Sequence, residues 1–199
     1  MAKYCETIEL LMEQFGKLPG IGARTAERLA FHVLKASKDE AMALARAIHD
    51  VKTKIRPCER CFNLTEAEVC NICADPRRDQ SVICVVEQPK DLLAIEATGV
   101  YDGVYHVLMG QIAPLDGVAP EDLTIDALVE RVKSGTVSEV ILATNPTVAG
   151  DGTALHITAL IEPLGAKITR LARGLPSGGQ IEYANKSILS DAINERREV

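Results

Sequence analysis

Apolar residues in the first quarter of the chain recur every three or four positions, the spacing that places them on one face of an α-helix. Three groups of this kind predict three helices between residues 7 and 56. The segment 18–22 interrupts the pattern after the first group, and Ser37 can cap the third helix together with Glu40. The members of the groups are Ile8, Leu11, Met12 and Phe15, then Ala26, Leu29, Ala30 and Val33, and finally Ala41, Leu44, Ala45 and Ile48.

The pattern changes after residue 79, where short apolar runs alternate with segments of helical spacing. Four runs predict strands buried in a sheet, at 81–86, 103–108, 139–143 and 167–171. Helices are expected at about 89–98, 125–133 and 153–162, and a last helix at 186–199. Strands that alternate with helices imply a parallel sheet covered on both sides.

Composition and charge then narrow the class of protein. Apolar residues make up 47% of the chain and charged residues 25%, which is typical of a folded protein and not of a disordered one. The net charge of −6 is unevenly distributed, because residues 1–60 contain eleven Lys/Arg and eight Asp/Glu, and the remainder contains eleven against twenty. With no Trp, four Tyr and three Phe, stacking on aromatic rings is not expected to be the main route to nucleic acid.

The sequence shows no sign of membrane insertion or secretion. No apolar run approaches the roughly 20 residues of a membrane-spanning helix. An acid, Glu6, stands where a signal peptide would have its apolar core. We therefore expect a cytoplasmic protein.

The segment 18–29 (LPGIGARTAERL) resembles a helix-hairpin-helix motif. Gly20 and Gly22 allow a tight turn and a close approach of the backbone to another surface, and the next helix begins with unpaired N–H groups that favour a phosphate. Arg24 and Arg28, four residues apart, share one helix face. A tight corner between helices without DNA contact is the alternative, and the hairpin can also serve dimerisation. The predicted DNA-binding residues are Lys17, Gly20, Gly22, Arg24 and Arg28.

Four cysteines follow the pattern C-x₂-C-x₈-C-x₂-C. Four thiolates at this spacing suit tetrahedral Zn²⁺, and a metal with four protein ligands is structural and not catalytic. Two disulfides would need an oxidising compartment, and an iron–sulfur cluster is a further alternative. The predicted zinc ligands are Cys58, Cys61, Cys70 and Cys73.

The other cysteines and the histidines show no ligand spacing. Cys84 lies in an apolar strand and is expected to be a small buried hydrophobe. The four scattered histidines are expected to be structural.

Polar and acidic residues follow two predicted strands, at the edge where open parallel sheets bind ligands. Glu87 follows the first strand, and Asn145 and Asp151 lie in a loop predicted at 144–151, after the third. This layout resembles a Toprim domain, where a Glu and a D-x-D pair hold Mg²⁺ for phosphoryl transfer. Three of the four acids of the type IA topoisomerase segment D-P-D-R-E-G-E are missing. We expect a degenerate site that contacts a partner or binds Mg²⁺ weakly; a helix cap or a solvated loop is the alternative role.

The order of these parts resembles the RecR family over essentially the whole chain. Beside the hairpin and the cysteines, the matching segments are 83–87, 105–108, 114–123, 141–148 and 172–183. The last of these, ARGLPSGGQIEY, is long and specific. Family members usually have Glu at the position of Ala149 and Gly at that of Ala119, and an acid at Asn185 and often at Gln180, so a metal or partner contact centred on the Toprim domain has fewer acids here.

The resemblance implies an α+β fold of several modules. It places a helix-hairpin-helix domain for DNA binding or oligomerisation at 1–56, a C4 zinc finger at 57–79, a Toprim domain with a parallel four-stranded sheet at 80–172, and a C-terminal loop and helix at 173–199.

The resemblance also implies a non-enzymatic recombination mediator of bacterial DNA repair, without catalytic residues and located on the nucleoid when bound to DNA. RecR-like proteins act with RecO, and often RecF, at gaps and single-strand/duplex junctions, where they promote RecA loading. They form tetrameric rings around DNA, with a dimer as the alternative. Two other functions compete with this one: a Mg²⁺-dependent Toprim nuclease or nucleotidyl transferase that uses Glu87 and Asp151, and a structural zinc adaptor without DNA affinity.

Overall fold

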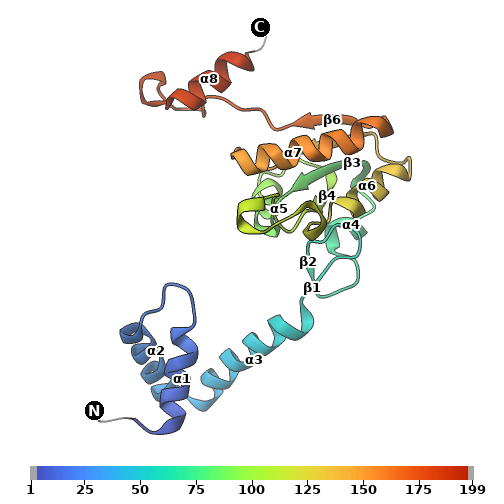
Figure 1. Ribbon diagram of the computed structural model, residues 1–199. Helices are drawn as coiled ribbons and strands as arrows, with labels where there is room; N and C mark the ends of the chain where they lie inside the picture. Colours follow the sequence, from blue (N-terminus) through green and yellow to red (C-terminus); the bar gives the residue numbers. More distant parts are fainter. Residues whose placement is uncertain (1–3, 197–199) are drawn as a thin grey trace. The chain divides into compact units, whose positions relative to one another are not determined.

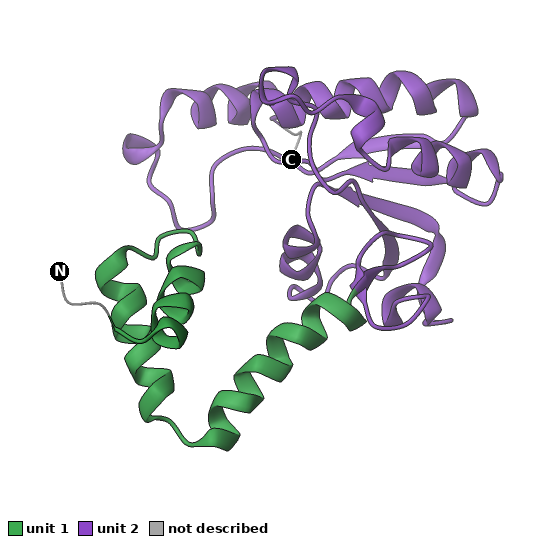
Figure 2. Cartoon of the chain, turned by 60° about the horizontal axis from the view of Figure 1, so that its bottom comes forward, with its two compact units in different colours: residues 1–55 green, residues 56–199 purple. Residues whose placement is uncertain are grey.

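The computed structural model describes residues 4–196 of the chain, which form two compact units (Figure 2). The first unit covers residues 1–55 and the second residues 56–199. No helix in the described part of the chain has the length and apolar character needed to cross a membrane.

The first unit is helical and contains α1 (Glu6–Gly16), α2 (Ala23–Lys35) and α3 (Lys38–Lys54). Helices α1 and α2 pack together, and the buried residues among those described in this unit are Ile8, Ala26 and Ala30. Ser37 caps α3 as predicted: its hydroxyl accepts a hydrogen bond from Glu40 N (3.3 Å), and the Glu40 carboxylate accepts one from Ser37 N (2.9 Å). None of the residues of α3 is buried.

The second unit opens with the cysteine-rich module. It consists of the antiparallel pair β1 (Arg56–Pro57) and β2 (Leu64–Thr65), followed by the short helix α4 (Asn71–Ala74). Phe62 turns the chain between the two strands with a left-handed backbone (φ 61°). A hydrogen bond from Val107 N to Cys61 O (2.8 Å) connects the module to the large sheet.

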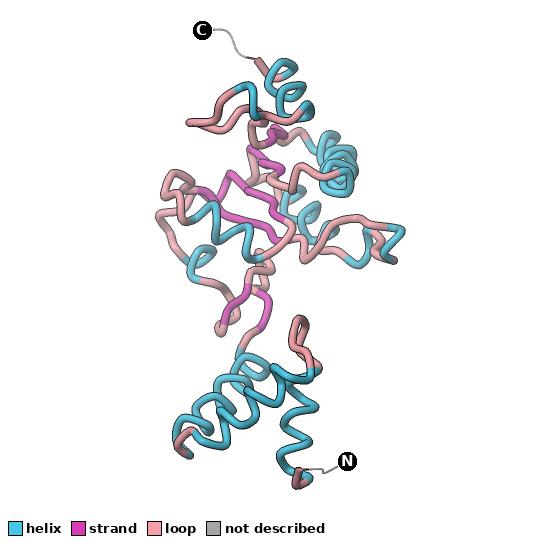
Figure 3. Tube along the Cα trace, turned by 90° about the vertical axis from the view of Figure 1, so that its left-hand side faces the viewer, coloured by secondary structure: helices cyan, strands magenta, loops and turns pink. Residues whose placement is uncertain are grey.

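The large sheet has four parallel strands in the order β4-β3-β5-β6. They are β3 (Asp79–Val86), β4 (Gly103–Val107), β5 (Glu139–Leu142) and β6 (Lys167–Arg170). Figure 1 labels β3, β4 and β6, and Figure 3 shows the strands in magenta. One face packs on α6 (Ile125–Lys133) and α7 (Val148–Ile161). The other face packs on α5 (Pro89–Glu96) and on side chains of the cysteine-rich module. The sheet is therefore covered on both sides, as a parallel sheet requires.

The rest of the second unit consists of short 3₁₀ turns and a C-terminal helix. The turns are Pro114–Asp116, Pro120–Asp122, Glu162–Leu164 and Ile181–Tyr183, and the helix is α8 (Lys186–Asn194). Asn185, one of the positions where the resemblance to the RecR family leads us to expect an acid, caps α8 by accepting a hydrogen bond from Ile188 N (2.9 Å). Either side chain can serve as this cap, because Asn and Asp are equally good N-caps.

The fold class predicted from the sequence is confirmed: a helical N-terminal part, a four-cysteine cluster, a parallel four-stranded sheet and a C-terminal helix. The predicted start of α7 at residue 153 is wrong. The helix begins at Val148, because the Thr147 hydroxyl accepts a hydrogen bond from Gly150 N (3.0 Å) and caps it. Asp151 consequently lies in the first turn of a helix and not in a loop. Residues 197–199 of the predicted last helix lie outside the described residues.

Candidate zinc centre, hairpin and strand-end site

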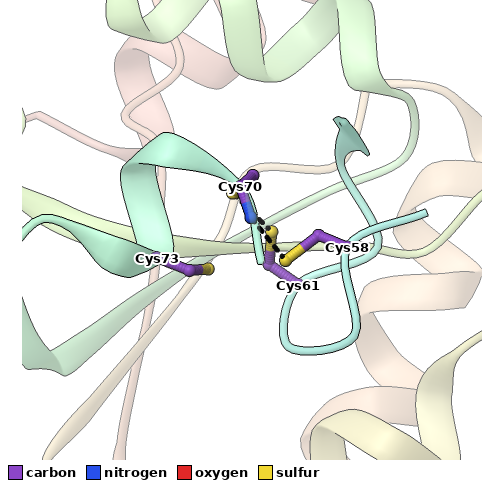
Figure 4. A group of neighbouring side chains, drawn as sticks. All are labelled: Cys58, Cys61, Cys70 and Cys73. Carbon is purple, nitrogen blue, oxygen red and sulfur yellow. Dashed lines mark hydrogen bonds between the residues drawn. The ribbon is translucent and has the colours of Figure 1, made fainter. Parts of the chain in front are cut away.

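The four predicted zinc ligands come together in one buried cluster (Figure 4). Their sulfur atoms all lie within 4.8 Å of one another, and the sulfurs of Cys61 and Cys70 are 3.5 Å apart. Four sulfurs at about 2.3 Å from a tetrahedral zinc ion would stand about 3.8 Å apart, close to the spacing found here. The cluster closes all four positions of such an ion, so its chemistry suits a structural metal.

Local hydrogen bonds hold the first two cysteines in a tight turn. Cys58 N donates to Asn63 O (2.7 Å), and Phe62 N donates to Cys58 O (2.9 Å). The second pair is placed by α4, because Cys70 stands at its N-cap and Cys73 lies within it. Cys70 N also donates to Cys58 Sγ (3.3 Å), which links the two pairs (Figure 4). An amide donor of this kind stabilises a thiolate.

The two isolated cysteines are not part of this cluster. Cys84 is buried in β3, and burial raises the pKa of its thiol to about 12. It is the small buried hydrophobe that the sequence predicts. No cysteine among the described residues forms a disulfide.

The hairpin between α1 and α2 contains one position whose backbone conformation requires glycine. Gly20 has a φ of +79°, which a residue with a side chain rarely adopts. Gly22 has an ordinary φ of −83° and stands at the N-cap of α2, so the expectation that both glycines make the turn holds only for Gly20. A Cβ atom at either glycine would meet nothing within 4 Å, so the chain leaves both backbones open to an external surface.

The first turn of α2 is available to an anion. No side chain caps it, and Thr25 and Ala26 are the first residues that donate back to Gly22 O. Arg24 and Arg28 are exposed, and neither forms an ion pair within the described chain. Lys17 differs from them, since it forms a salt bridge with Glu13 (2.8 Å).

The strand-end site is built from Glu87, which is 5% exposed at the end of β3. Its carboxylate accepts two hydrogen bonds from Asn145, one from the backbone N (2.8 Å) and one from Nδ2 (2.6 Å). Gly150 closes the other side: a Cβ there would stand 2.1 Å from Asn145 O and 2.8 Å from Glu87 Oε1. Glu87 is thus enclosed by protein donors.

Asp151 has its own partners and does not join Glu87. It accepts hydrogen bonds from Arg170 Nη2 (2.6 Å) and from both terminal nitrogens of Arg173. The Arg173 guanidinium, followed by that of Arg170, lowers the Asp151 pKa to about 2. The sequence interpretation missed both arginines, which lie 19 and 22 residues further along the chain.

These contacts make the strand-end site a poor fit for Mg²⁺. The ion needs oxygen ligands that are free to complete a near-octahedral shell. Here both oxygens of Glu87 are hydrogen-bonded to Asn145, and Asp151 is paired with two arginines. No chemical step through magnesium follows from this arrangement.

Comparison with known proteins decides the family. A domain model described as the RecR helix-hairpin-helix matches residues 8–52, and one described as the RecR four-cysteine zinc finger domain matches residues 55–75. "Recombination protein RecR" of Rhodopirellula baltica is 55% identical over 197 residues, 99% of both chains. The chain belongs to the RecR family. The RecR protein of Rubrobacter xylanophilus is 54% identical over the full length of both chains, and that of Staphylococcus aureus is 50% identical over 98% of this chain and 99% of its own.

A Toprim domain model matches residues 81–172, which contain nearly the whole large sheet. The RecR zinc-finger match includes all four clustered cysteines, so the cluster fits zinc binding. The predicted resemblance to the RecR family is confirmed. The RecR relatives are named recombination proteins, which supports a role in recombination and repair.

Proposed function

We propose that this protein is a non-enzymatic recombination mediator that binds DNA through its hairpin. The observation that carries the proposal is the pair Arg24 and Arg28, which are exposed beside an uncapped helix start and have no acidic partner among residues 4–196. Backbone N–H groups and guanidinium groups together bind phosphates without reading sequence. This mode of binding suits a protein that acts at gaps of any sequence.

The DNA contact is tested by replacing both arginines with alanine. Loss of two phosphate contacts lowers the slope of log K against log salt by about 2 and weakens binding to gapped DNA. Fluorescence anisotropy at several salt concentrations measures both quantities. The matched control is Arg46→Ala with Lys52→Ala, which removes the same charge from exposed positions on α3. An unchanged slope in Arg24→Ala/Arg28→Ala, or an equal loss in the control, excludes the hairpin as the DNA site.

Assembly with further copies is the second part of the proposal. Helix α3 exposes Met42, Leu44, Ile48 and Val51. An apolar pocket of about 330 Å³ lies between α1 and α2 in the same unit, lined by residues that include Ile8 and Phe31. Apolar surface of this kind marks a protein interface. We assign it to a second copy of the chain, as in the tetrameric rings of RecR-like proteins.

Leu44→Glu with Ile48→Glu tests the assembly. The double variant has a smaller mass in solution than the wild type, measured by sedimentation, while Lys52→Glu on the same helix keeps the wild-type mass. Equal masses for all three proteins, whether monomeric or larger, would contradict the assignment.

The absence of catalysis rests on the strand-end contacts. Glu87 is held by Asn145, and Asp151 by Arg170 and Arg173, so neither carboxylate is free to act on a phosphodiester. The competing function, a Mg²⁺-dependent nuclease or nucleotidyl transferase, predicts cleavage or joining of labelled gapped DNA that Glu87→Ala abolishes. Our proposal predicts that pure protein with Mg²⁺ leaves the DNA intact.

Family membership and the charge distribution support a proposal for the partners. Residues after 60 carry a net charge of −9 (eleven Lys/Arg against twenty Asp/Glu), which suits a basic protein better than DNA. We assign RecO, with RecF as a further partner, to the second unit, and promotion of RecA loading at gaps to the complex. Acting on the chromosome, the protein would work in the cytoplasm. Co-sedimentation with purified RecO tests the assignment. We expect the two proteins to sediment together and added salt to weaken their association.

A further inference from the structure

Arg131 on α6 is a partly buried cation without an acidic partner. Its Nη1 donates a hydrogen bond to Tyr105 O (2.8 Å) and lies 3.4 Å from His106 Nδ1. Tyr105 and His106 are fully buried in β4. Within residues 4–196, Arg131 forms no salt bridge with a carboxylate. A guanidinium in such surroundings is costly unless another negative charge lies nearby.

The negative charge that acts on Arg131 is that of the cysteine cluster. Burial lowers the pKa of Arg131, and the thiolates of Cys73, Cys61 and Cys58 act against that shift. A Zn²⁺ ion bound to four thiolates has a net charge of −2, because the thiolates together contribute −4 and the ion +2. The metal site therefore needs positive charge around it as much as Arg131 needs negative charge.

The cysteine module and Arg131 meet on the same strand. Val107 N donates to Cys61 O (2.8 Å), and the Phe62 ring packs edge-on against His106 with 5.3 Å between ring centres. Arg131 reaches the backbone of this strand from α6. Metal site, strand and helix are thus linked by direct contacts.

A second arginine lies on the same side of the module. Arg60 Nη1 donates to Cys73 O (3.3 Å), and Arg60 and Arg131 both line one pocket of about 430 Å³ with Phe62 and Gln80. Arg60 is exposed. Two guanidinium groups, one from the module and one from α6, match the two excess charges of a zinc tetrathiolate.

We propose that Arg131, assisted by Arg60, is the counter-charge of the zinc tetrathiolate and thereby retains the metal and holds the zinc module on the Toprim domain. This inference rests on zinc in the cysteine cluster and is independent of DNA binding. Arg131 is a positioning residue, because it acts on the metal through charge and not as a ligand.

The competing explanation is that Arg131 only provides a hydrogen bond to Tyr105 O. Three substitutions separate the two. Arg131→Lys keeps the charge, Arg131→Gln keeps an N–H donor without charge, and Arg131→Met keeps neither. If Arg131 acts through its charge, Arg131→Lys should retain zinc about as well as the wild type. Arg131→Gln should lose zinc about as easily as Arg131→Met, because neither side chain is charged. A purely hydrogen-bonding role would place Gln with the wild type.

The experiment measures zinc release from the full-length zinc-loaded protein. The rate of transfer to a chromogenic chelator and the reaction of the thiols with an aromatic disulfide reagent are recorded together. Groups that support the ligands of a metal typically contribute about 10- to 100-fold in affinity, so Arg131→Gln and Arg131→Met should release zinc at least about 10-fold faster. Arg131→Lys should stay within about 3-fold of the wild type. Added salt should reduce the difference in zinc release rate between Arg131→Gln and the wild type, because it screens the interaction between charges.

Arg77→Gln is the matched control, because it removes one positive charge from a highly exposed side chain that pairs with Asp75. It should release zinc at the wild-type rate. Arg60→Gln keeps the proposal testable if Arg131→Gln does not fold, since Arg60 is exposed; it should speed release in the same direction. Wild-type release from Arg131→Gln, release from Arg131→Lys as fast as from Arg131→Gln, or wild-type release from Arg60→Gln would overturn the proposal.

Discussion

Two glycines in α7 give a sharp test of how this helix packs on the strand-end site. Gly150 and Gly152 lie two residues apart in the same helix. A Cβ at Gly150 would stand 2.1 Å from the backbone oxygen of Asn145, whereas a Cβ at Gly152 would meet nothing within 4 Å. Alanine at either position gains the same helix propensity, about 1 kcal/mol. The difference between the two variants therefore isolates the steric contact.

Gly152→Ala should raise the free energy of unfolding of the second unit by about 0.5–1 kcal/mol. In Gly150→Ala the Asn145 backbone has to move, and overpacking of this kind costs about 1–3 kcal/mol. Gly150→Ala should consequently be less stable than Gly152→Ala by about 1–3 kcal/mol, towards the upper end because the contact is with backbone.

Urea unfolding followed by circular dichroism at 222 nm measures this difference, since the chain has no Trp for fluorescence. Equal m-values would show that both variants unfold the same surface. DNA affinity, which we assign to the first unit, should not change in either variant. Equal stability of the two proteins would refute the packing of α7 against Asn145 and Glu87.

Three further predictions concern the metal and the titrating groups. Removing zinc with a chelator should lower the midpoint of thermal unfolding and expose the four clustered thiols to a thiol reagent. The circular dichroism signal of the helices in the first unit should persist. An unchanged melting curve would contradict a structural metal. Asp151 has its pKa lowered to about 2, so it contributes stability above about pH 4 that is lost as the pH falls towards 2. Asp151→Asn should flatten this part of the stability–pH curve, and a curve equal to that of the wild type would contradict the ion pairs with Arg170 and Arg173. Burial lowers the pKa of His106 to about 3, so the NMR signals of its ring should not titrate between pH 5 and 8. The free energy of unfolding should fall as the pH drops below about 6.5, because there the unfolded chain takes up a proton on His106 and the folded protein does not. A titration midpoint near 6.5 in the folded protein would contradict the burial of His106.

Local patterns in the sequence were sufficient to predict most of the fold. The helix predicted at 125–133 has the same bounds in the structure, because its apolar positions follow one face from end to end. The cysteine cluster could also be predicted from the sequence, since the spacing of metal ligands within a short segment is a local property.

Contacts between distant segments account for what the sequence did not reveal. The segment 148–152 (VAGDG) has the composition of a loop, but Thr147 caps it and Gly150 packs closely on Asn145, so the packing outweighs the weak helix propensity of glycine. The pairing of Asp151 with Arg173 and the contact of Arg131 with Tyr105 O on β4 also depend on the folded sheet. No spacing rule along the chain marks either of them.

The amide of Asn145 gives the corner at the end of β3 a property that an acid would not. The side-chain Nδ2 of Asn145 donates to one oxygen of Glu87, beside the backbone N–H that donates to the other, and an acid at this position could not supply the Nδ2 donor. Both oxygens of Glu87 therefore have donors within the chain. An aspartate in place of Asn145 would set a second carboxylate against Glu87, and the two would then need a proton or a cation between them.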